Sequence, residues 1–173
     1  MDLVRITMDD PGFQEALYLY ETAFPYEERR DMPEQRRIMA HPDYHFTLLT
    51  QDGQMMGIVL YWQTETFLFL EHLATKPTLR GKGLGSAVLA LLKEKGLPII
   101  LEIEPPTDEI TMRRRDFYLR NGFHMTEHHH IQAKFRHDDE DLVLKILSFP
   151  TKVDKGQYDS FHRYMLQHIS VQP

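Results

Sequence analysis

The 173-residue sequence contains no cysteine, which excludes several kinds of chemistry at once. Without thiols there can be no disulfide, no thiolate metal site and no covalent thiol intermediate. Long apolar runs are also absent, and stretches such as residues 87–92 are far too short to span a bilayer. The first ten residues lack the basic and then apolar plan of a signal peptide. We therefore expect a cytoplasmic protein that does not enter a membrane.

Basic residues are fewer than acidic residues. The chain has 20 Lys and Arg residues against 26 Asp and Glu residues, a formal net charge of -6. Long-range attraction to nucleic acid or to an anionic membrane is therefore not expected. A hydrophobic content of 42% is ordinary for a globular protein and supplies enough apolar material for a core. The length predicts a single domain over residues 1–173.

Periodicity along the chain predicts the order β-α-α-β-β-β-α-β-α-β-β-α. Two or three antiparallel strands are expected over residues 44–75, with a hairpin turn at Asp52–Gly53. Two more strands are expected over residues 124–135 and 142–149, followed by a C-terminal helix. A strand, a crossover helix and a second strand over residues 67–104 imply a parallel pair inside a mixed sheet.

A bare glycine turn, "RGKGLG", stands between the predicted strand 67–75 and the next helix. A dinucleotide fingerprint would need G-x-G-x-x-G, but Ser86 occupies its third glycine position. A P-loop would need Lys and Ser or Thr after its last glycine, but Ser and Ala follow Gly85. Two interpretations remain: a tight turn without a ligand, or backbone N–H groups that hold a pyrophosphate at a helix N-terminus. Arg80 and Lys82 add positive charge there.

Two motifs resemble the GNAT N-acetyltransferase superfamily. The stretch "LATKPTLRGKGLGSAVLALL" is similar to its acetyl-CoA signature, [RQ]-x-x-G-x-[GA], with the defined positions filled by Arg80, Gly83 and Gly85. The stretch "RRRDFYLRNGF" resembles its second landmark through Tyr118, Gly122 and Phe123. The resemblance covers roughly residues 48–123, and the flanks match only in the order of their elements.

The resemblance implies an α/β (α+β) GNAT-like fold. Its centre would be a twisted mixed, mostly antiparallel sheet flanked by helices, with a splayed parallel strand pair at the acetyl-CoA site. Backbone groups at the end of the strand would pair with the pantetheine arm, and the glycine turn would wrap the pyrophosphate. The residues so implied are Leu73, Ala74, Thr75, Arg80, Gly81, Lys82, Gly83, Leu84, Gly85 and Ser86. Thr111 departs from the pattern, since many relatives have a cofactor-contacting Asn there.

The activity implied is transfer of an acetyl group from acetyl-CoA directly to a primary amine, with no metal. Tyr118 is the expected general acid, because a phenol is protonated at neutral pH. Glu71 and Glu102 are both candidates for the base, with Glu71 slightly favoured. Strand alternation would place Glu71 on one face with Leu73 and Thr75, and would turn His72 away unless a bulge re-aims it. The backbone N–H of Leu73 would stabilise the oxyanion.

Several alternatives remain open from the sequence. One is a non-catalytic acyl-CoA-binding or regulatory module on the same fold, and another is a nucleotide-binding regulator. The acceptor is a small-molecule or peptide amine, which Glu27 or Glu28 would attract. Residues 128–130 are three histidines that fix no third metal ligand, so no metal is expected, although one imidazole could line the acceptor pocket. A homodimer is possible.

Overall fold

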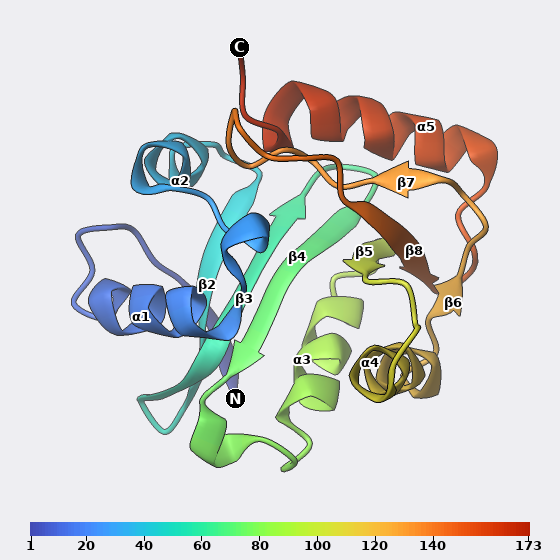
Figure 1. Ribbon diagram of the computed structural model, residues 1–173. Coiled ribbons are helices and arrows are strands. Elements are labelled where there is room, and N and C mark those ends of the chain that lie inside the picture. The colour runs from blue at the N-terminus through green and yellow to red at the C-terminus, as the bar shows by residue number, and fades with distance from the viewer.

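The computed structural model describes residues 1–173 as one sheet with helices on both of its faces (Figure 1). Neighbouring strands follow the order β1-β2-β3-β4-β5-β8-β6, and β7 pairs with β8. Their bounds are β1 Asp2–Arg5, β2 Tyr44–Gln51, β3 Gln54–Gln63, β4 Leu68–Thr75, β5 Ile99–Ile103, β6 His124–Met125, β7 His130–Ile131 and β8 Val143–Phe149. Only β4 and β5 pair in parallel, and every other ladder is antiparallel.

The helices divide between the two faces of the sheet and bury two separate cores. The helices are α1 Phe13–Ala23, α2 Met32–Met39, α3 Leu84–Lys93, α4 Glu109–Arg120 and α5 Lys155–Tyr164, with a π-helical turn at Met165–Ile169. One core joins α1, α2 and α5 to Leu60, Trp62 and Phe69 of the sheet. The other joins α3 and α4 to Val59, Leu70 and Leu101 on the opposite face. No helix is long and apolar enough to cross a membrane.

The parallel pair at the centre of the sheet stays together for only a short distance. Register between β4 and β5 runs from Leu68 opposite Ile99 to Leu70 opposite Leu101, and then stops. Strand β4 nevertheless continues to Thr75, still paired with β3. The two strands therefore separate beyond Leu70. The predicted fold class, a mixed and mostly antiparallel sheet with a splayed parallel pair, is confirmed.

The histidine-rich segment departs from the prediction of one continuous strand. It contains only the two-residue strands β6 and β7. Between them His128 lies 3.2 Å from the carbonyl oxygen of Val153, and its ring stacks on Tyr158 of α5 with centroids 4.3 Å apart. The chain therefore leaves the β8 ladder to make contacts with α5. A strand periodicity in the sequence does not reveal such a detour.

Candidate active site

The glycine turn presents an uninterrupted row of backbone donors. Gly81 and Gly83 have φ angles of 75° and 78°, a left-handed conformation that glycine adopts without steric cost. None of the backbone N–H groups from Gly81 to Ser86 donates a hydrogen bond within the protein; the first donor of α3 is Ala87, to the Gly83 carbonyl. Free N–H groups at a helix N-terminus favour an anionic ligand. The donor set therefore fits a diphosphate.

Gly85, the third defined position of the signature, has a different role. A Cβ atom at this position would lie 2.9 Å from the Phe117 ring of α4. Because real Cβ contacts are not that short, a larger residue would require the Phe117 ring or α3 to shift. The glycine therefore lets the Phe117 ring of α4 lie close against the start of α3.

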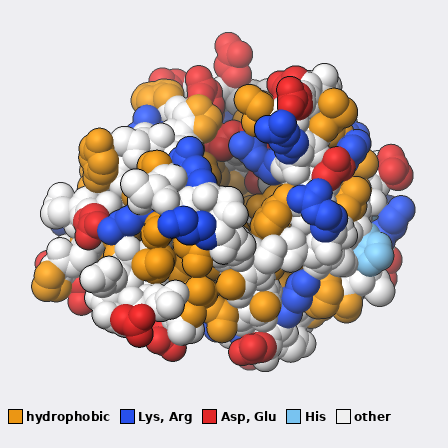
Figure 2. Space-filling view, turned by 90° about the horizontal axis from the view of Figure 1, so that it is seen from below, with side chains coloured by type: hydrophobic (Ala, Val, Ile, Leu, Met, Phe, Trp, Pro, Cys, Tyr) orange, Lys and Arg blue, Asp and Glu red, His pale blue; other side chains and the backbone are white.

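Basic groups surround the entrance to the site despite the acidic composition of the chain. Arg80 and Lys82 are exposed on the glycine turn, and Arg114 of α4 lines the same cavity as Arg80. On the face seen from below, Lys and Arg side chains flank a hollow (Figure 2). This side of the molecule can attract a small anion even though the whole chain carries net negative charge.

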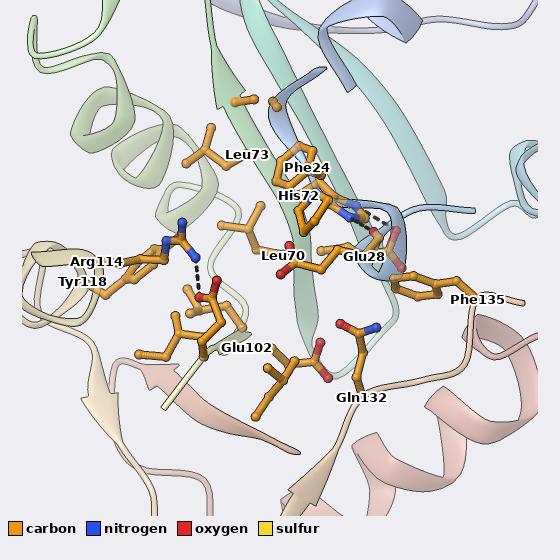
Figure 3. A pocket seen from close by; sticks show the side chains of 18 of the residues that line it. Phe24, Glu28, Leu70, His72, Leu73, Glu102, Arg114, Tyr118, Gln132 and Phe135 are labelled. Carbon is orange, nitrogen blue, oxygen red and sulfur yellow. Dashed lines mark hydrogen bonds and ion pairs between the residues drawn. The ribbon is translucent and has the colours of Figure 1, made fainter. Parts of the chain in front are cut away.

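A cavity of about 300 Å³ occupies the gap where β4 and β5 separate. Tyr118 and Arg114 of α4 lie on one side, and Phe24, Glu28 and His72 on another (Figure 3). Its wall also includes Glu102, which the sequence predicted as a site residue, and Gln132 and Phe135, which it did not. The cavity therefore brings the predicted acid, both predicted bases and the end of β4 around one space.

The open edge of β4 carries unpaired backbone groups. Lys76 donates its N–H to the Met56 carbonyl of β3, and N–H groups alternate in direction along a strand. The N–H groups of Leu73 and Thr75 therefore point away from β3, toward the gap. Ala74 faces the other way, because its carbonyl oxygen approaches Gly57 of β3. The backbone of Leu73 and Thr75 is free for a ligand, whereas that of Ala74 is not.

A β-bulge at Glu71 changes the predicted direction of the side chains on β4. Leu60 of β3 pairs with His72, and the next residue, Tyr61, pairs with Leu70, so Glu71 is the extra residue. Glu71 and His72 both turn toward the face of α1 and α2, where His72 packs against Tyr20 and Phe24. Leu73 packs into the opposite core. The expectation that Glu71 and Leu73 share one face was wrong.

The carboxylate of Glu71 is fully engaged by protein groups. Arg30 forms two bonds to it, of 2.6 and 2.7 Å, and the indole N–H of Trp62 donates a third, of 3.1 Å. Burial would by itself raise the pKa of Glu71, but the Arg30 charge, the nearby His72 side chain and the Arg30 hydrogen bonds lower it to about 2. A carboxyl group with so low a pKa is a poor proton acceptor. These contacts argue against Glu71 as the base.

Arg30 is the partner that sequence reasoning did not identify. Its guanidinium lies 4.1 Å from the centre of the Phe135 ring and also donates to the Ile169 carbonyl at 3.1 Å. Both side chains of the ion pair are 1% exposed. Arg30 appeared in the sequence only as one of several charges in a mixed loop. No local pattern marks it as buried.

Glu102 on β5 has a different environment. Its side chain is 10% exposed and lines the cavity, and no lysine or arginine pairs with it. Its single protein partner is the Nε2 atom of His130 on β7, whose Nδ1 lies 2.9 Å from the Tyr158 hydroxyl. A carboxylate with one oxygen held and the cavity beside it can accept a proton from a bound ligand.

Tyr118 sits on α4 between the aromatic rings of Phe117 and Phe123, with centroid distances of 5.0 and 5.7 Å. Burial is the main influence on the phenol and raises its pKa to about 12. The hydroxyl group is therefore protonated over the whole physiological range. Since Tyr118 also lines the cavity, it can deliver a proton there.

Acidic groups dominate the part of the cavity away from the glycine turn. Glu104 pairs with Arg114, and Glu102 pairs with His130, but Glu28 has no ion pair or side-chain hydrogen bond. Burial and the nearby Glu104 raise the pKa of Glu28, with burial the larger cause. Glu27, the other predicted attractant, is exposed and outside the cavity wall. A cationic ligand would supply the partner that Glu28 lacks.

Thr111, the departure from the family pattern, has a structural role at the start of α4. Its hydroxyl accepts from the N–H groups of Thr107 and Asp108, while Asp108 accepts from the Thr111 N–H at 2.8 Å. This reciprocal arrangement is a capping box, which stabilises the first turn of a helix. Its hydroxyl therefore serves the first turn of α4.

The three consecutive histidines separate as a strand would place them. His128 and His130 turn inward to α5, and His129 is exposed. No group of three or more His, Asp or Glu residues is arranged to hold a metal ion. None of the three imidazoles lines the cavity, so the expectation that one might do so was wrong. His130 instead contacts the cavity residue Glu102.

Comparison with known proteins agrees with this geometry. The model of the acetyltransferase (GNAT) domain matches residues 35–125. "Putative acetyltransferase YjbC" of Bacillus subtilis (strain 168) is 27% identical over 154 residues, which cover 82% of this chain and 78% of that protein. A solved structure, "Putative acetyltransferase from GNAT family" of Bacteroides thetaiotaomicron, superposes with a TM-score of 0.90 and 28% identity over 99% of this chain and 100% of that one.

An aminoglycoside 6'-N-acetyltransferase complexed with coenzyme A shares the fold. It superposes with a TM-score of 0.58 at 16% identity and covers 89% of this chain and 100% of that one. The family model spans more than half of the 173 residues and includes both the splayed strands and the glycine turn. The chain therefore belongs to the GNAT family of acetyltransferases.

Proposed function

We propose that this acetyltransferase is a single domain over residues 1–173 that moves the acetyl group of acetyl-CoA directly to a primary amine. The cavity between β4 and β5 carries the proposal, because the glycine turn approaches it from one end and acidic groups line the other. The free N–H groups of residues 81–86 would hold the diphosphate, with Arg80 and Lys82 beside it. Leu73 and Thr75 would bind the pantetheine arm.

The reaction requires the amine to lose a proton before it can attack the thioester. A lysine-like ammonium has a pKa of about 10.4, so a base must accept its proton. Glu102 fits this role better than Glu71, because Arg30 and Trp62 already occupy the Glu71 carboxylate. The amine nitrogen then bonds to the acetyl carbon and the carbon–sulfur bond breaks.

The leaving group and the oxyanion need separate partners. Tyr118 would donate its phenolic proton to the departing thiolate of coenzyme A, for which its high pKa keeps it protonated. The backbone N–H of Leu73, which points into the gap, would donate to the thioester oxygen as that oxygen gains charge. No side-chain nucleophile and no metal take part in these steps.

The acceptor end of the cavity favours a positively charged ligand. Glu28 lies there without a protein partner, and Phe24 and Phe135 provide apolar and aromatic walls. An unpaired, half-buried carboxylate gains from a cation placed against it. We assign Glu28 to the capture of the acceptor ammonium group before Glu102 takes its proton.

Three measurements test the proposal. Acetyl-CoA should raise the melting temperature more than a nicotinamide dinucleotide does, since a ligand at 100 times its dissociation constant stabilises by about 2.7 kcal/mol. A panel of primary amines, assayed by release of free thiol, should contain an acceptor. Tyr118→Phe should then lower kcat about 100-fold and keep acetyl-CoA affinity. The absence of both the thermal shift and thiol release would refute the assignment.

A further inference from the structure

His130 connects the cavity to the surface of α5 through a short polar network. Its side chain is fully buried between Glu102, which its Nε2 contacts, and Tyr158, whose hydroxyl lies 2.9 Å from its Nδ1. The Tyr158 hydroxyl also lies 3.2 Å from the His129 carbonyl. Two histidines and one carboxylate surround Tyr158 on its outer side: His128, His162 and Asp159.

The donors and acceptors of these groups allow two arrangements of protons in the network, with the heavy atoms in the same positions. The Tyr158 hydroxyl has one proton to donate. If it donates to His130 Nδ1, the imidazole is neutral and its Nε2–H donates to Glu102. If it donates to the His129 carbonyl and Glu102 is ionised, both ring nitrogens of His130 must be protonated to bond Tyr158 and Glu102. The network can therefore hold one additional proton without rearrangement.

We propose that His130 and Tyr158 are positioning residues for Glu102, an inference that rests on the role of Glu102 in the proposed function. The imidazole holds one carboxylate oxygen, and the other has no protein partner. A neutral His130 leaves Glu102 basic enough to take the amine proton. A protonated His130 stabilises the carboxylate anion and weakens it as a base. The protonation of His130 therefore controls the catalytic carboxylate from outside the cavity.

The test compares His130→Gln with His129→Gln, the same change at the exposed neighbour. An amide can still donate to Glu102 but does not titrate. In His130→Gln the acid limb of the kcat/KM profile should move to lower pH by about one unit or more, because an amide, unlike an imidazole, cannot take up the additional proton. His129→Gln should keep the wild-type limb. An unchanged limb in His130→Gln, or only a uniform fall in rate, would overturn the proposal.

Tyr158→Phe provides a variant that leaves the buried imidazole in place. It should lower kcat/KM a few-fold while the acid limb stays, since the imidazole beside Glu102 is still present. The KM for acetyl-CoA should be unchanged, because the network lies away from the glycine turn. If the acid limb disappears in Tyr158→Phe, the limb does not depend on His130, and the proposal is contradicted.

Nitrogen-15 NMR of the histidine side chains tests the same pairing without activity. The Nε2 signal of His130, identified by its loss in His130→Gln, should change its chemical shift in Glu102→Gln, because its hydrogen-bond partner changes from a carboxylate to an amide. No response to Glu102→Gln would refute the inference. A chain that acetylates no amine would refute the proposed function, whereas this spectrum would still decide whether Glu102 and His130 are coupled.

Discussion

Glu71 and Glu102 occupy neighbouring strands and face the same cavity, yet their surroundings differ. Glu71 lies on a bulge and receives two bonds from Arg30 and one from Trp62. Glu102 lies on a regular part of β5 and receives one bond, from His130. A strong cation holds the first as an anion, and a titratable imidazole holds the second. The difference indicates that the groups around a carboxylate decide whether it stabilises the fold or transfers a proton.

The largest expected effect is that of Glu71 on the stability of the fold. Glu71→Gln leaves the buried Arg30 guanidinium without its counter-charge, and breaking one partner of a buried pair costs about 3 to 5 kcal/mol. The free energy of unfolding in urea should fall by this amount. As a control, replacing both residues together, Arg30→Met with Glu71→Leu, should cost less than the single change. An equal or larger loss in the double variant would show that the charges are not what matters.

The pH dependence of stability sharpens the same contrast. The pKa of Glu71 is lowered to about 2 in the folded chain, against 4.5 for an ordinary glutamate. Its stabilising contribution is therefore complete above pH 4.5 and is lost as the pH falls toward 2. The difference in unfolding free energy between wild type and Glu71→Gln should shrink over that interval. A constant difference from pH 7 to pH 3 would contradict the ion-pair account.

Glu102 should respond in activity rather than in stability. Glu102→Gln keeps a hydrogen-bond acceptor for His130 but removes the base, so kcat/KM should fall about 100-fold or more. Its unfolding free energy should change by much less than that of Glu71→Gln. Initial rates over a range of acceptor concentrations, together with urea unfolding of the same samples, give both quantities. Full activity in Glu102→Gln would return the role of base to another group, Glu28 or a bound water.

The smallest expected effect concerns Glu28, another carboxylate of the cavity. Glu28→Lys should raise the Michaelis constant for the acceptor several-fold, because it replaces attraction of a cation by repulsion. Glu27→Lys is the matched control, since Glu27 is exposed and lies outside the cavity wall. The Michaelis constant for acetyl-CoA should hold steady in both variants. Equal effects of the two changes would show that Glu28 acts only as a general surface charge.

The sequence was sufficient for the fold and for the backbone geometry of the glycine turn. The glycine turn, the splayed strand pair and Tyr118 depend on local motifs, and these fix backbone conformation and element order directly. The divergence of Glu71 from Glu102 was not predictable in the same way. It depends on a bulge that moves Glu71 to another face, and on Arg30, which is 41 positions away in the sequence. Alternation along a strand cannot anticipate either.

The same limit applies to the three histidines. Their spacing correctly separates His129 from its neighbours, but the partners of His130 lie on β5 and α5. Contacts between residues that are distant in sequence decide which imidazole touches the site. A single sequence carries no record of them.

The hydrogen bond from Arg30 to the Ile169 carbonyl has a consequence for the order of folding during synthesis. It ties the loop that carries Arg30 to a residue 139 positions further along the chain. A nascent chain can build most of its sheet while the last segment is still inside the ribosome tunnel. Enclosure of the Arg30 guanidinium must wait until the turn Met165–Ile169 has left the tunnel and can close over it.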